Sequence, residues 1–472
     1  MKQTKIIATM GPASCNEIMI EKLVQAGVNV FRMNFSHGTH EFHAENIIKI
    51  RKTAEKLSVP IGIMADLQGP KIRVSKFEGN QTDLPTGASF ILDTAYDSMG
   101  NNQIVGVDYK ELSNDVKSGD ILLLDEGKIT FKGVSVTGSK ITCNVTQGGI
   151  LKNNKGINKL GGGLTAPALT EKDLDDIKFI AKQNIDYVAI SFPKTAEDMI
   201  FARRKLVQAG ANAQIIAKIE RTEAVLHHLD AIIEASDGVM VARGDLAVEV
   251  GEAMVPGLQK KIVRTCRKLH KISIVATQML ESMIDNPVAT RAEVSDIANA
   301  VLDGTDAVML SAETASGSYP LQAVKTMASV CEEAEKTADY DLETKLQNER
   351  FDNIQQTISM AALFSAYHIN ANAIIALTSS GSTARWMSRV INDKPIYAIT
   401  DNLTALNGMT LYRSVHAFMM PTKAETTSKH IEQACDFLVR QLVIKAGDTI
   451  VVTTGDKVSK IGSTNTVKVI KI

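Results

Sequence analysis

The chain has few cysteines, and they follow no pattern. Five occur in 472 residues, an odd number, and none belongs to a Cys-x-x-Cys motif. Scattered cysteines argue against both a disulfide framework and a thiolate metal site, and they are typical of a reducing compartment. No His/Cys spacing of the kind that binds zinc is present either. We therefore expect a cytoplasmic protein.

Long apolar runs and an excess of one charge are also missing. No apolar run approaches the ~18 residues of a membrane span, and the lysine-led N-terminus passes directly into a strand pattern, which leaves no room for a signal-peptide core. Lys+Arg number 52 and Asp+Glu number 53, so the formal charge is nearly zero. Bulk attraction to nucleic acid or to an anionic membrane is therefore not expected.

The common nucleotide-binding motifs do not occur. There is no Walker A sequence GxxxxGK[ST] and no kinase-type GxGxxG, and no Ser-His-Asp constellation suggests itself. If the protein uses a nucleotide, it holds it in another way. A lone cation in a glycine-rich segment, Lys155 in NNKGINKLGGG, is a weak candidate for a phosphate contact.

The dominant pattern is an alternation of strands and helices. It runs over residues 4–67, stops, and resumes over residues 170–336, which gives three strands and then five. Eight such units predict an α/β fold of the (β/α)₈ TIM-barrel type. A doubly wound open sheet is the competing architecture. Polar residues at the carboxyl end of nearly every strand favour the barrel.

Two further regions depart from this rhythm. Between Pro70 and Pro167, short β-branched runs alternate with turn signals, which predicts an inserted all-β lid domain. After a charged stretch, a second α/β pattern predicts a C-terminal regulatory domain of ordinary size. The expected organisation is a barrel of residues 1–69 and 168–345, a lid of residues 70–167 and a C-terminal domain of residues 346–472.

The most informative stretch is QIIAKIE, residues 214–220. Side chains alternate along a strand, so Ile216, Lys218 and Glu220 share one face while their neighbours face the packing helices. A cation beside a carboxylate is often only a buried salt bridge. In a parallel barrel, however, this end of the strand is where active sites are built.

Other strand ends carry residues of matching chemistry. Arg32 offers a fork for phosphate, and the oxygens of Asn34 and Ser36 suit a hard cation, although NFSHG alone could be a helix-capping turn. Glu220 and Asp245, at neighbouring strand ends, could together hold Mg²⁺, with substrate oxygens and water completing the shell. The remaining polar strand-end positions are Asp66, Ser191, Gly244 and Thr277.

Taken together, these stretches resemble pyruvate kinase along the whole chain. The resemblance rests on MNFSHG, DLQGPKIR, NNKGIN, AKIE, MVARGDL, ATQMLESM, TRAEVSDIANAVLDGTDAVMLS and GSTNT. DLQGPKIR and NNKGINKLGGGL are most similar to the bacterial type II branch, which is activated by AMP or sugar monophosphates. The resemblance implies transfer of the phosphoryl group of phosphoenolpyruvate to ADP, yielding pyruvate and ATP in the last step of glycolysis, by a homotetramer.

The resemblance also implies roles for individual residues. Glu220 and Asp245 would carry Mg²⁺, or Mn²⁺, while Lys218 would stabilise charge on the transferred group. Arg32 and Ser191 would fix the phosphate. The substrate carboxylate would be held by the amides of Gly244 and Asp245 and by Thr277, which would lie near the carbon that is later protonated. The implied nucleotide site comprises Asn34, Phe35, Ser36, His37, Arg73 and Lys155.

Two departures from the family pattern affect the ions. Members that require K⁺ have a glutamate where this chain has Lys71, and their potassium ligands match Asn34, Ser36, Asp66 and the Leu67 carbonyl. An ammonium group can replace a compact monovalent cation, so we expect that K⁺ is not required; the alternative is that Lys71 points to solvent and K⁺ still binds. The lid also carries Asp125-Glu126-Gly127 where a second aspartate is common, which leaves its contacts with the nucleotide–metal complex less defined.

The C-terminal domain contains a candidate anion site between a strand and a helix. Hydroxyl groups and free N–H groups at a helix start favour an anion, although the same residues also make a well-capped helix. With the resemblance, we expect a phosphorylated effector there, with help from the loop at residues 456–464. The residues are Thr378, Ser379, Ser380, Gly381, Ser382 and Thr383.

Two other functions compete with this interpretation. A metal-dependent barrel lyase acting on enolpyruvate would share the carboxylate pair and the lysine. It would not need a nucleotide lid with Lys155 and Arg73. A non-catalytic metabolite sensor built from the C-terminal domain would not need Lys218, Glu220 or Asp245, and all three are present.

Overall fold

A closed barrel of eight parallel strands forms the centre of the molecule, as the sequence predicts. The computed structural model describes residues 2–338, 351, 353–421, 424, 426–456 and 462–472. Around the barrel the strands neighbour one another in the order β1-β16-β15-β14-β13-β12-β3-β2. Their bounds are β1 Lys5–Thr9, β2 Val30–Asn34, β3 Gly62–Asp66, β12 Tyr187–Ile190, β13 Gln214–Ile219, β14 Gly238–Ala242, β15 Ile272–Ala276 and β16 Ala307–Leu310.

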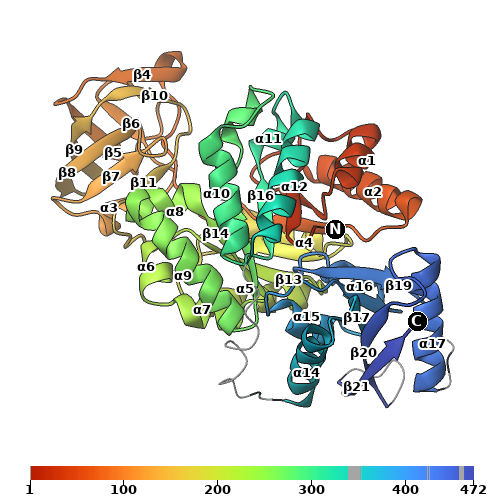
Figure 1. Cartoon of the computed structure of the whole chain (residues 1–472). Coiled ribbons are helices and arrows are strands. Elements are labelled where there is room, and N and C mark those ends of the chain that lie inside the picture. The colour runs from red at the N-terminus through yellow and green to blue at the C-terminus, as the bar shows by residue number, and fades with distance from the viewer. Residues whose placement is uncertain (1, 339–350, 352, 422–423, 425, 457–461) are drawn as a thin grey trace.

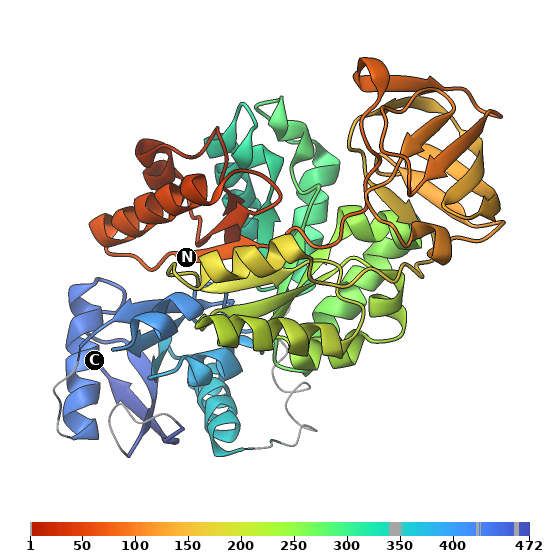
Figure 2. The same ribbon diagram turned by 180° about the vertical axis from the view of Figure 1, so that it is seen from behind.

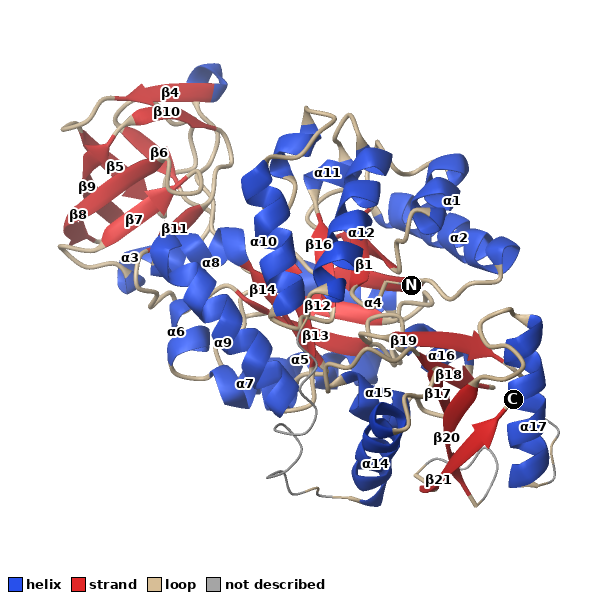
Figure 3. Ribbon diagram, in the orientation of Figure 1, coloured by secondary structure: helices blue, strands red, loops and turns tan. Residues whose placement is uncertain are grey.

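Helices cover the outside of the barrel, as the ring of blue around red strands in Figure 3 shows. Several begin at side-chain caps: Asn16, Thr39, Thr170 and Thr290 each accept a hydrogen bond from an N–H group of the first turn, which fixes where the helix starts. The helices are α1 Glu17–Gln25, α2 His40–Leu57, α4 Glu171–Ile180, α5 Ala196–Ala209, α6 Thr222–Leu226, α7 Leu229–Ala235, α8 Arg243–Val250, α9 Val255–Lys268, α10 Arg291–Leu302, α11 Ala312–Ala315 and α12 Pro320–Lys336.

The two faces of the barrel strands belong to different cores. On β13, Ile215, Ala217 and Ile219 pack with the surrounding helices, whereas Ile216 belongs to a cluster that fills the barrel interior. This interior cluster continues into side chains of the C-terminal domain, such as Leu411. The amino-terminal end of the barrel is therefore closed by apolar packing, and the polar residues of β13 lie toward the opposite end.

The β-rich insertion between β3 and α4 stands away from the barrel (Figure 1, orange). It contains a six-stranded sheet of order β11-β7-β8-β9-β5-β6 and a two-stranded sheet, β10-β4. Its only α-helix among the described residues is the single turn α3, Leu112–Asp115. The strands are β4 Gln81–Leu84, β5 Ser89–Asp93, β6 Ile104–Gly106, β7 Ile121–Leu124, β8 Ile129–Thr137, β9 Lys140–Gln147, β10 Gly149–Lys152 and β11 Ile157–Lys159.

The C-terminal α/β domain lies on the far side of the barrel from the lid in both views (Figures 1 and 2, blue). Its sheet has the order β19-β18-β17-β20-β21, in which the last strand is antiparallel. The elements are α14 Ile354–His368, β17 Ala373–Leu377, α15 Ser382–Ser388, β18 Ile396–Thr400, α16 Leu403–Gly408, β19 Val415–Met419, α17 Thr427–Arg440, β20 Thr449–Gly455 and β21 Thr464–Lys471. The predicted boundary at residues 345/346 falls outside the described residues.

In the described part of the chain, none of the helices combines the length and the apolar character needed to cross a membrane.

Candidate active site

Four strand ends bring oppositely charged side chains together at the carboxyl end of the barrel. The Lys218 Nζ atom lies 2.9 Å from Oε1 of Glu220 and 3.3 Å from Oδ1 of Asp66, and it donates a 2.8 Å hydrogen bond to Ser191 Oγ. The salt bridge that the sequence allows within β13 is therefore present. It is one contact in a larger cluster rather than an isolated pair.

Asp66 is the centre of this cluster. Its Oδ2 atom accepts hydrogen bonds from Arg32 Nε at 2.7 Å and lies 2.6 Å from Arg32 Nη2, while Oδ1 faces Lys218. Arg32 Nη1 also donates to Thr9 Oγ1 at 3.1 Å. The sequence assigned Asp66 only to a monovalent cation site, whereas the structure shows it pairing with both Arg32 and Lys218.

The carboxylates of the cluster are not equally stabilised. Burial by itself raises the pKa of Asp66, but Lys218 and Arg32 outweigh it, so this pKa lies below its usual range. Burial raises the pKa of Glu220 to about 7, even though Lys218 opposes the shift. Burial also acts to lower the pKa of Lys218, and the charges of Asp66 and Glu220 overcome this and raise it. The negative charge on Glu220 is therefore not fully compensated by its neighbours, and a further cation would stabilise it.

Glu220 and Asp245 fit the divalent site that the sequence suggests. The side chain of Glu220 is fully buried, and its Oε1 atom has no well-directed hydrogen bond, while Oε2 accepts one from the Phe192 N–H group at 2.8 Å. Asp245 is one-quarter exposed and pairs with Lys71 Nζ at 3.1 Å. No group of three or more His, Cys, Asp or Glu is arranged around a metal in the described residues. Two carboxylates with substrate oxygens and water form a common type of Mg²⁺ site.

The contact between Lys71 and Asp245 differs from both expectations for this lysine. The sequence placed the ammonium group beside the oxygens of Asn34 and Ser36 or else in solvent, and the structure pairs it with a candidate metal ligand. Asn34 Oδ1 accepts the Ser36 N–H group at 3.1 Å, and the Leu67 carbonyl accepts the Ser191 hydroxyl at 2.7 Å. Lys71 lies in the loop after β3 and Asp245 in the first turn of α8, so the folding of two segments far apart in the sequence decides this pairing.

Gly244 and Thr277 meet where α8 begins. The Gly244 N–H group donates to Thr277 Oγ1 at 2.9 Å, and Thr277 has a φ of +69°, a strained conformation for a β-branched residue. The group that holds this turn is Arg243, to which the sequence pattern assigned no role. Its guanidinium group is buried, donates to the carbonyl of Thr277 at 2.7 Å, and pairs with Asp296 at 2.6 Å. The N-terminus of α8 favours a nearby anion, and its Gly244 N–H group is already bonded to Thr277.

The predicted nucleotide residues come from two parts of the molecule. Phe35 is buried and stacks on His43, with ring centroids 4.3 Å apart, so its side chain serves packing. In the lid, Arg73 pairs with Gly156 as a β-bridge, which brings it next to Lys155. Lys155 forms an ion pair with Asp125 at 2.7 Å. A phosphate that used Lys155 would have to compete with this lid carboxylate.

The return segment of the lid is tied to the barrel near Glu220. The Gly163 N–H group donates to Glu223, and the Gly161 N–H group donates to the Glu249 carbonyl at 3.1 Å. Arg221 lies over the Phe192 ring, 5.4 Å from its centroid, and Phe192 in turn contacts Glu220 through its backbone. The sequence analysis missed Arg221. The signal available was its position directly after the strand that carries Lys218 and Glu220.

The candidate effector loop links β17 to α15. Thr378 Oγ1 accepts the Gly381 N–H group at 3.0 Å, and the Ser380 hydroxyl donates to Ser382 Oγ at 3.1 Å. Thr383 is buried and hydrogen-bonded to Thr464 at 2.9 Å. Ser379 and Ser382 are partly exposed and Ser380 is exposed. Part of the 456–464 loop lies outside the described residues.

Comparisons with known proteins agree with this geometry. The family described as "Pyruvate kinase, barrel domain" matches residues 1–324, and "Pyruvate kinase, alpha/beta domain" matches residues 356–470. The chain is 48% identical to a pyruvate kinase of Buchnera aphidicola and 47% identical to pyruvate kinase II of Salmonella typhimurium, in each case over 100% of this chain and 99% of the relative. A crystal structure of a pyruvate kinase from Cryptosporidium parvum superposes with a TM-score of 0.94 at 32% identity, covering 100% of this chain and 96% of that one.

Proposed function

The chain belongs to the pyruvate kinase family, and on that premise we propose which of its residues transfer the phosphoryl group from phosphoenolpyruvate to ADP. The observation that carries the proposal is the cluster in which Asp66 fixes Arg32 and Lys218. Phosphoryl transfer depends on positioning and on neutralising charge more than on covalent chemistry. Two pre-oriented cations at the mouth of a barrel suit both requirements. A barrel lyase is not favoured, because the family matches cover the barrel and the C-terminal domain alike.

Lys218 stabilises the charge on the phosphoryl group as it moves, and Arg32 fixes two of its oxygens. The Lys218 ammonium is held by Asp66, Glu220 and Ser191, so it needs no reorganisation when charge develops in front of it. The Gly244 and Asp245 amides at the start of α8 hold the substrate carboxylate. Thr277, bonded to Gly244, lies beside the carbon that receives a proton when pyruvate forms.

Glu220 and Asp245 hold the divalent ion, Mg²⁺ or Mn²⁺, which neutralises phosphoryl and enolate oxygens when bound. The incomplete stabilisation of the Glu220 carboxylate supports this assignment. Lys71 pairs with one oxygen of Asp245, so its ammonium group would have to leave that contact for Asp245 to bind the ion. ADP then lies toward Asn34, Ser36 and His37, beneath the lid residues Arg73 and Lys155.

Substitution of Lys218 tests the assignment directly. Lys218→Met should bind ADP and Mn²⁺ as the parent enzyme does but lose roughly 3 kcal/mol or more of transition-state stabilisation, which is on the scale of one preorganised electrostatic contact. Lys260→Met is the matched control, because Lys260 pairs with Asp303 outside the cluster. Single-turnover experiments measure the rate of phosphoryl transfer in each variant. Equilibrium dialysis measures ADP binding separately, so that a loss of rate is distinguished from a loss of binding. Near-normal turnover in Lys218→Met would refute the role given to it.

The enzyme works without K⁺. Lys71 keeps an ammonium group at the carboxyl end of the barrel, where its positive charge serves in place of the ion. Activity in Na⁺ or Tris salts should equal activity in K⁺, and Lys71→Glu should make the rate depend on K⁺. Strong activation of the unmodified enzyme by K⁺ would contradict this.

A phosphorylated activator, AMP or a sugar phosphate, binds the 378–383 loop. The accessible hydroxyls of Ser380 and Ser382 and the start of α15 support the assignment. Such activators should lower the concentration of phosphoenolpyruvate needed for half-maximal rate, and Ser382→Glu should abolish that response by charge repulsion. Ser365→Glu, on the exposed face of α14, serves as the control for an added charge. A surviving response in Ser382→Glu would place the effector elsewhere.

We further propose that the working form is a cytoplasmic homotetramer with no nucleic-acid or membrane partner. Sedimentation velocity across a range of protein concentrations tests the assembly, and a stable monomer with full activity would contradict it.

A further inference from the structure

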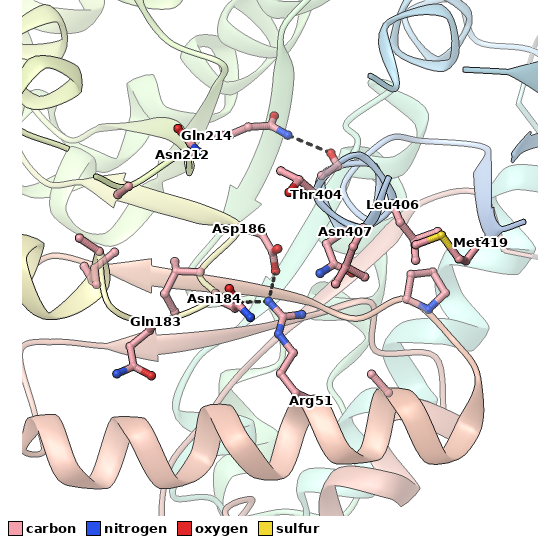
Figure 4. Close-up of a pocket in the computed structure, with 18 of the residues that line it drawn as sticks. Arg51, Gln183, Asn184, Asp186, Asn212, Gln214, Thr404, Leu406, Asn407 and Met419 are labelled. Carbon is pink, nitrogen blue, oxygen red and sulfur yellow. Dashed lines mark hydrogen bonds and ion pairs between the residues drawn. The ribbon is translucent and has the colours of Figure 1, made fainter. Parts of the chain in front are cut away.

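A second cavity lies at the opposite end of the barrel from the active site. Its volume is about 710 Å³, within the range of sites for small organic ligands. It opens where the end of α2 and the loops before β12 and β13 meet helix α16 of the C-terminal domain (Figure 4). Gln214 lines it at the first residue of β13, and Lys218 lies four residues further along the strand, about 13 Å away.

The charged groups of this cavity are already neutralised. Arg51 Nη2 pairs with Asp186 at 2.7 Å, and the Arg51 guanidinium also donates to the carbonyls of Ile61 at 2.6 Å and Asn184 at 2.5 Å. Glu55 adds a second carboxylate to the wall. The lining thus carries one cation and two anions, so it repels a phosphate or a carboxylate, in contrast to the serine-rich 378–383 loop.

The cavity joins the barrel and the C-terminal domain through fixed polar contacts. Gln214 Nε2 donates to the Gly408 carbonyl at 3.0 Å, and the Tyr187 hydroxyl donates to the Asn407 carbonyl at 3.2 Å. Figure 4 shows Arg51 and Asp186 pointing toward each other on the barrel side, with Thr404 and Asn407 facing them from α16. A molecule in this space would touch both domains at once.

The groups left for a ligand are uncharged. The amides of Gln183, Asn184 and Asn212 and the hydroxyl of Thr404 line the cavity, and the buried Arg51 Nε–H has no hydrogen-bond partner among the described residues. Each amide offers a donor beside an acceptor, the pattern that reads the edge of a nucleobase. Apolar atoms make up most of the exposed lining, and Val59, Pro60 and the adaptable Met419 supply a surface for a flat ring.

We propose that this interdomain cavity binds an uncharged nucleoside, with its base against the apolar wall and its polar edge read by the amides. The bound molecule contacts α2 and the loops of the barrel on one side and α16 on the other. Because it binds only when the C-terminal domain is seated on the barrel, it stabilises that seating. This inference does not depend on the roles proposed for the residues at the mouth.

Nucleoside binding to the full-length protein tests the proposal. Adenosine, guanosine, cytidine and uridine are the probes, observed by saturation-transfer NMR and by the shift of thermal unfolding temperature. Asn212→Trp places an indole ring in the cavity from an exposed position. Lys182→Trp is the control, because it adds the same ring at an exposed position that does not line the cavity. We expect at least one nucleoside to bind the parent and the Lys182→Trp variant equally, and Asn212→Trp to weaken it at least about tenfold.

Other outcomes overturn the proposal. Failure of all four nucleosides to bind would do so, as would binding that Asn212→Trp leaves unchanged, because that signal would come from the nucleotide site at the other end of the barrel. AMP that binds more tightly than adenosine, and is lost in Asn212→Trp, would show that the cavity recognises a phosphate. Thr404→Trp provides an independent check from the C-terminal side, where Thr404 is exposed, and it should weaken nucleoside binding as Asn212→Trp does.

Discussion

The two ends of the barrel both bury ionic groups, but they use them differently. At the carboxyl end, Asp66 holds two cations while Glu220 remains incompletely stabilised. At the amino end, Asp306 pairs through both oxygens with Arg389 of the C-terminal domain, and each side chain is 2% exposed. Asp306 also accepts N–H groups from Ser273 at 2.9 Å and Arg413 at 3.1 Å.

The difference separates chemistry from assembly. A carboxylate whose bonds are all satisfied gains little from a ligand, and Asp306 therefore fixes one domain to another. Glu220 keeps an oxygen without a directed hydrogen bond at a mouth that substrates can reach, so it can still gain from a metal ion. The comparison predicts that substitutions at the amino end of the barrel change stability, whereas substitutions at the carboxyl end change the catalytic rate.

The largest effect is expected from removing the buried ion pair at the amino end of the barrel. Asp306→Ala leaves the buried Arg389 without its partner, and removing one member of a buried pair costs about 3–5 kcal/mol of unfolding free energy. Urea unfolding followed by circular dichroism measures the loss, and kcat of the protein that remains folded should change little. The control is Glu21→Ala, which breaks an exposed pair with Lys56 and should cost less than about 1 kcal/mol. Equal costs for the two variants would contradict the comparison.

Removing the charge of Asp66, at the carboxyl end of the barrel, should lower the catalytic rate instead. Asp66→Asn keeps the shape of the side chain but removes the charge that orients Arg32 and Lys218, and such misplacement should lower kcat/KM by about 100-fold or more. Steady-state kinetics give the size of the change. Asp176→Asn removes a buried charge that pairs with Lys172 and contacts His40 outside the cluster, and it should keep the parent rate. A larger loss of stability than in Asp306→Ala would reverse the assignment of the two ends.

The smallest effect is a dependence of stability on pH that arises at the amino end of the barrel. Burial, together with the charge of neighbouring Lys2, lowers the pKa of Lys5 to about 7, and Lys5 Nζ donates to the Val415 carbonyl at 2.6 Å. Between pH 7 and 10 the folded protein holds Lys5 neutral, whereas the unfolded chain still protonates it. The unfolded state thus binds more protons, so stability rises with pH by up to about 1.4 kcal/mol per unit from this group.

Lys5→Met should remove that slope. The unfolding free energies of the parent and the variant are measured at pH 7, 8 and 9. The difference in unfolding free energy between the two proteins should become smaller as the pH increases. The variant is expected to be relatively most stable at the lower pH values, where it lacks the buried charge. Parallel curves for the two proteins would show that Lys5 does not titrate in this range.

Much of the architecture was predictable from the sequence because it depends on local periodicity. The alternation of strands and helices indicated eight barrel units, and the period of two along 214–220 placed Lys218 and Glu220 on one face. The inserted β domain was visible from turn residues between short β-branched runs. The lengths of segments and the order of polar strand ends were enough for these predictions.

Contacts across the barrel were not predictable in the same way. Asp66 lies on β3 and its two cations on β2 and β13, which is not adjacent to β3 in the barrel order. The pairing of Lys71 with Asp245 links residues 174 positions apart. Arg243 follows β14 directly and Arg221 lies two residues after β13, and nothing local distinguishes an arginine that holds a turn or stacks on Phe192 from one that faces solvent.

The sequence by itself determined the fold, the family and the kinds of chemical group at the mouth, because periodicity and residue type are properties of short segments. Only the folded chain shows which carboxylate holds which cation, that Lys71 contacts Asp245, and that an interdomain cavity lies at the amino end. The physical reason is that barrel closure and domain packing set the distances between groups far apart in the chain. Those distances fix the energies of their charges.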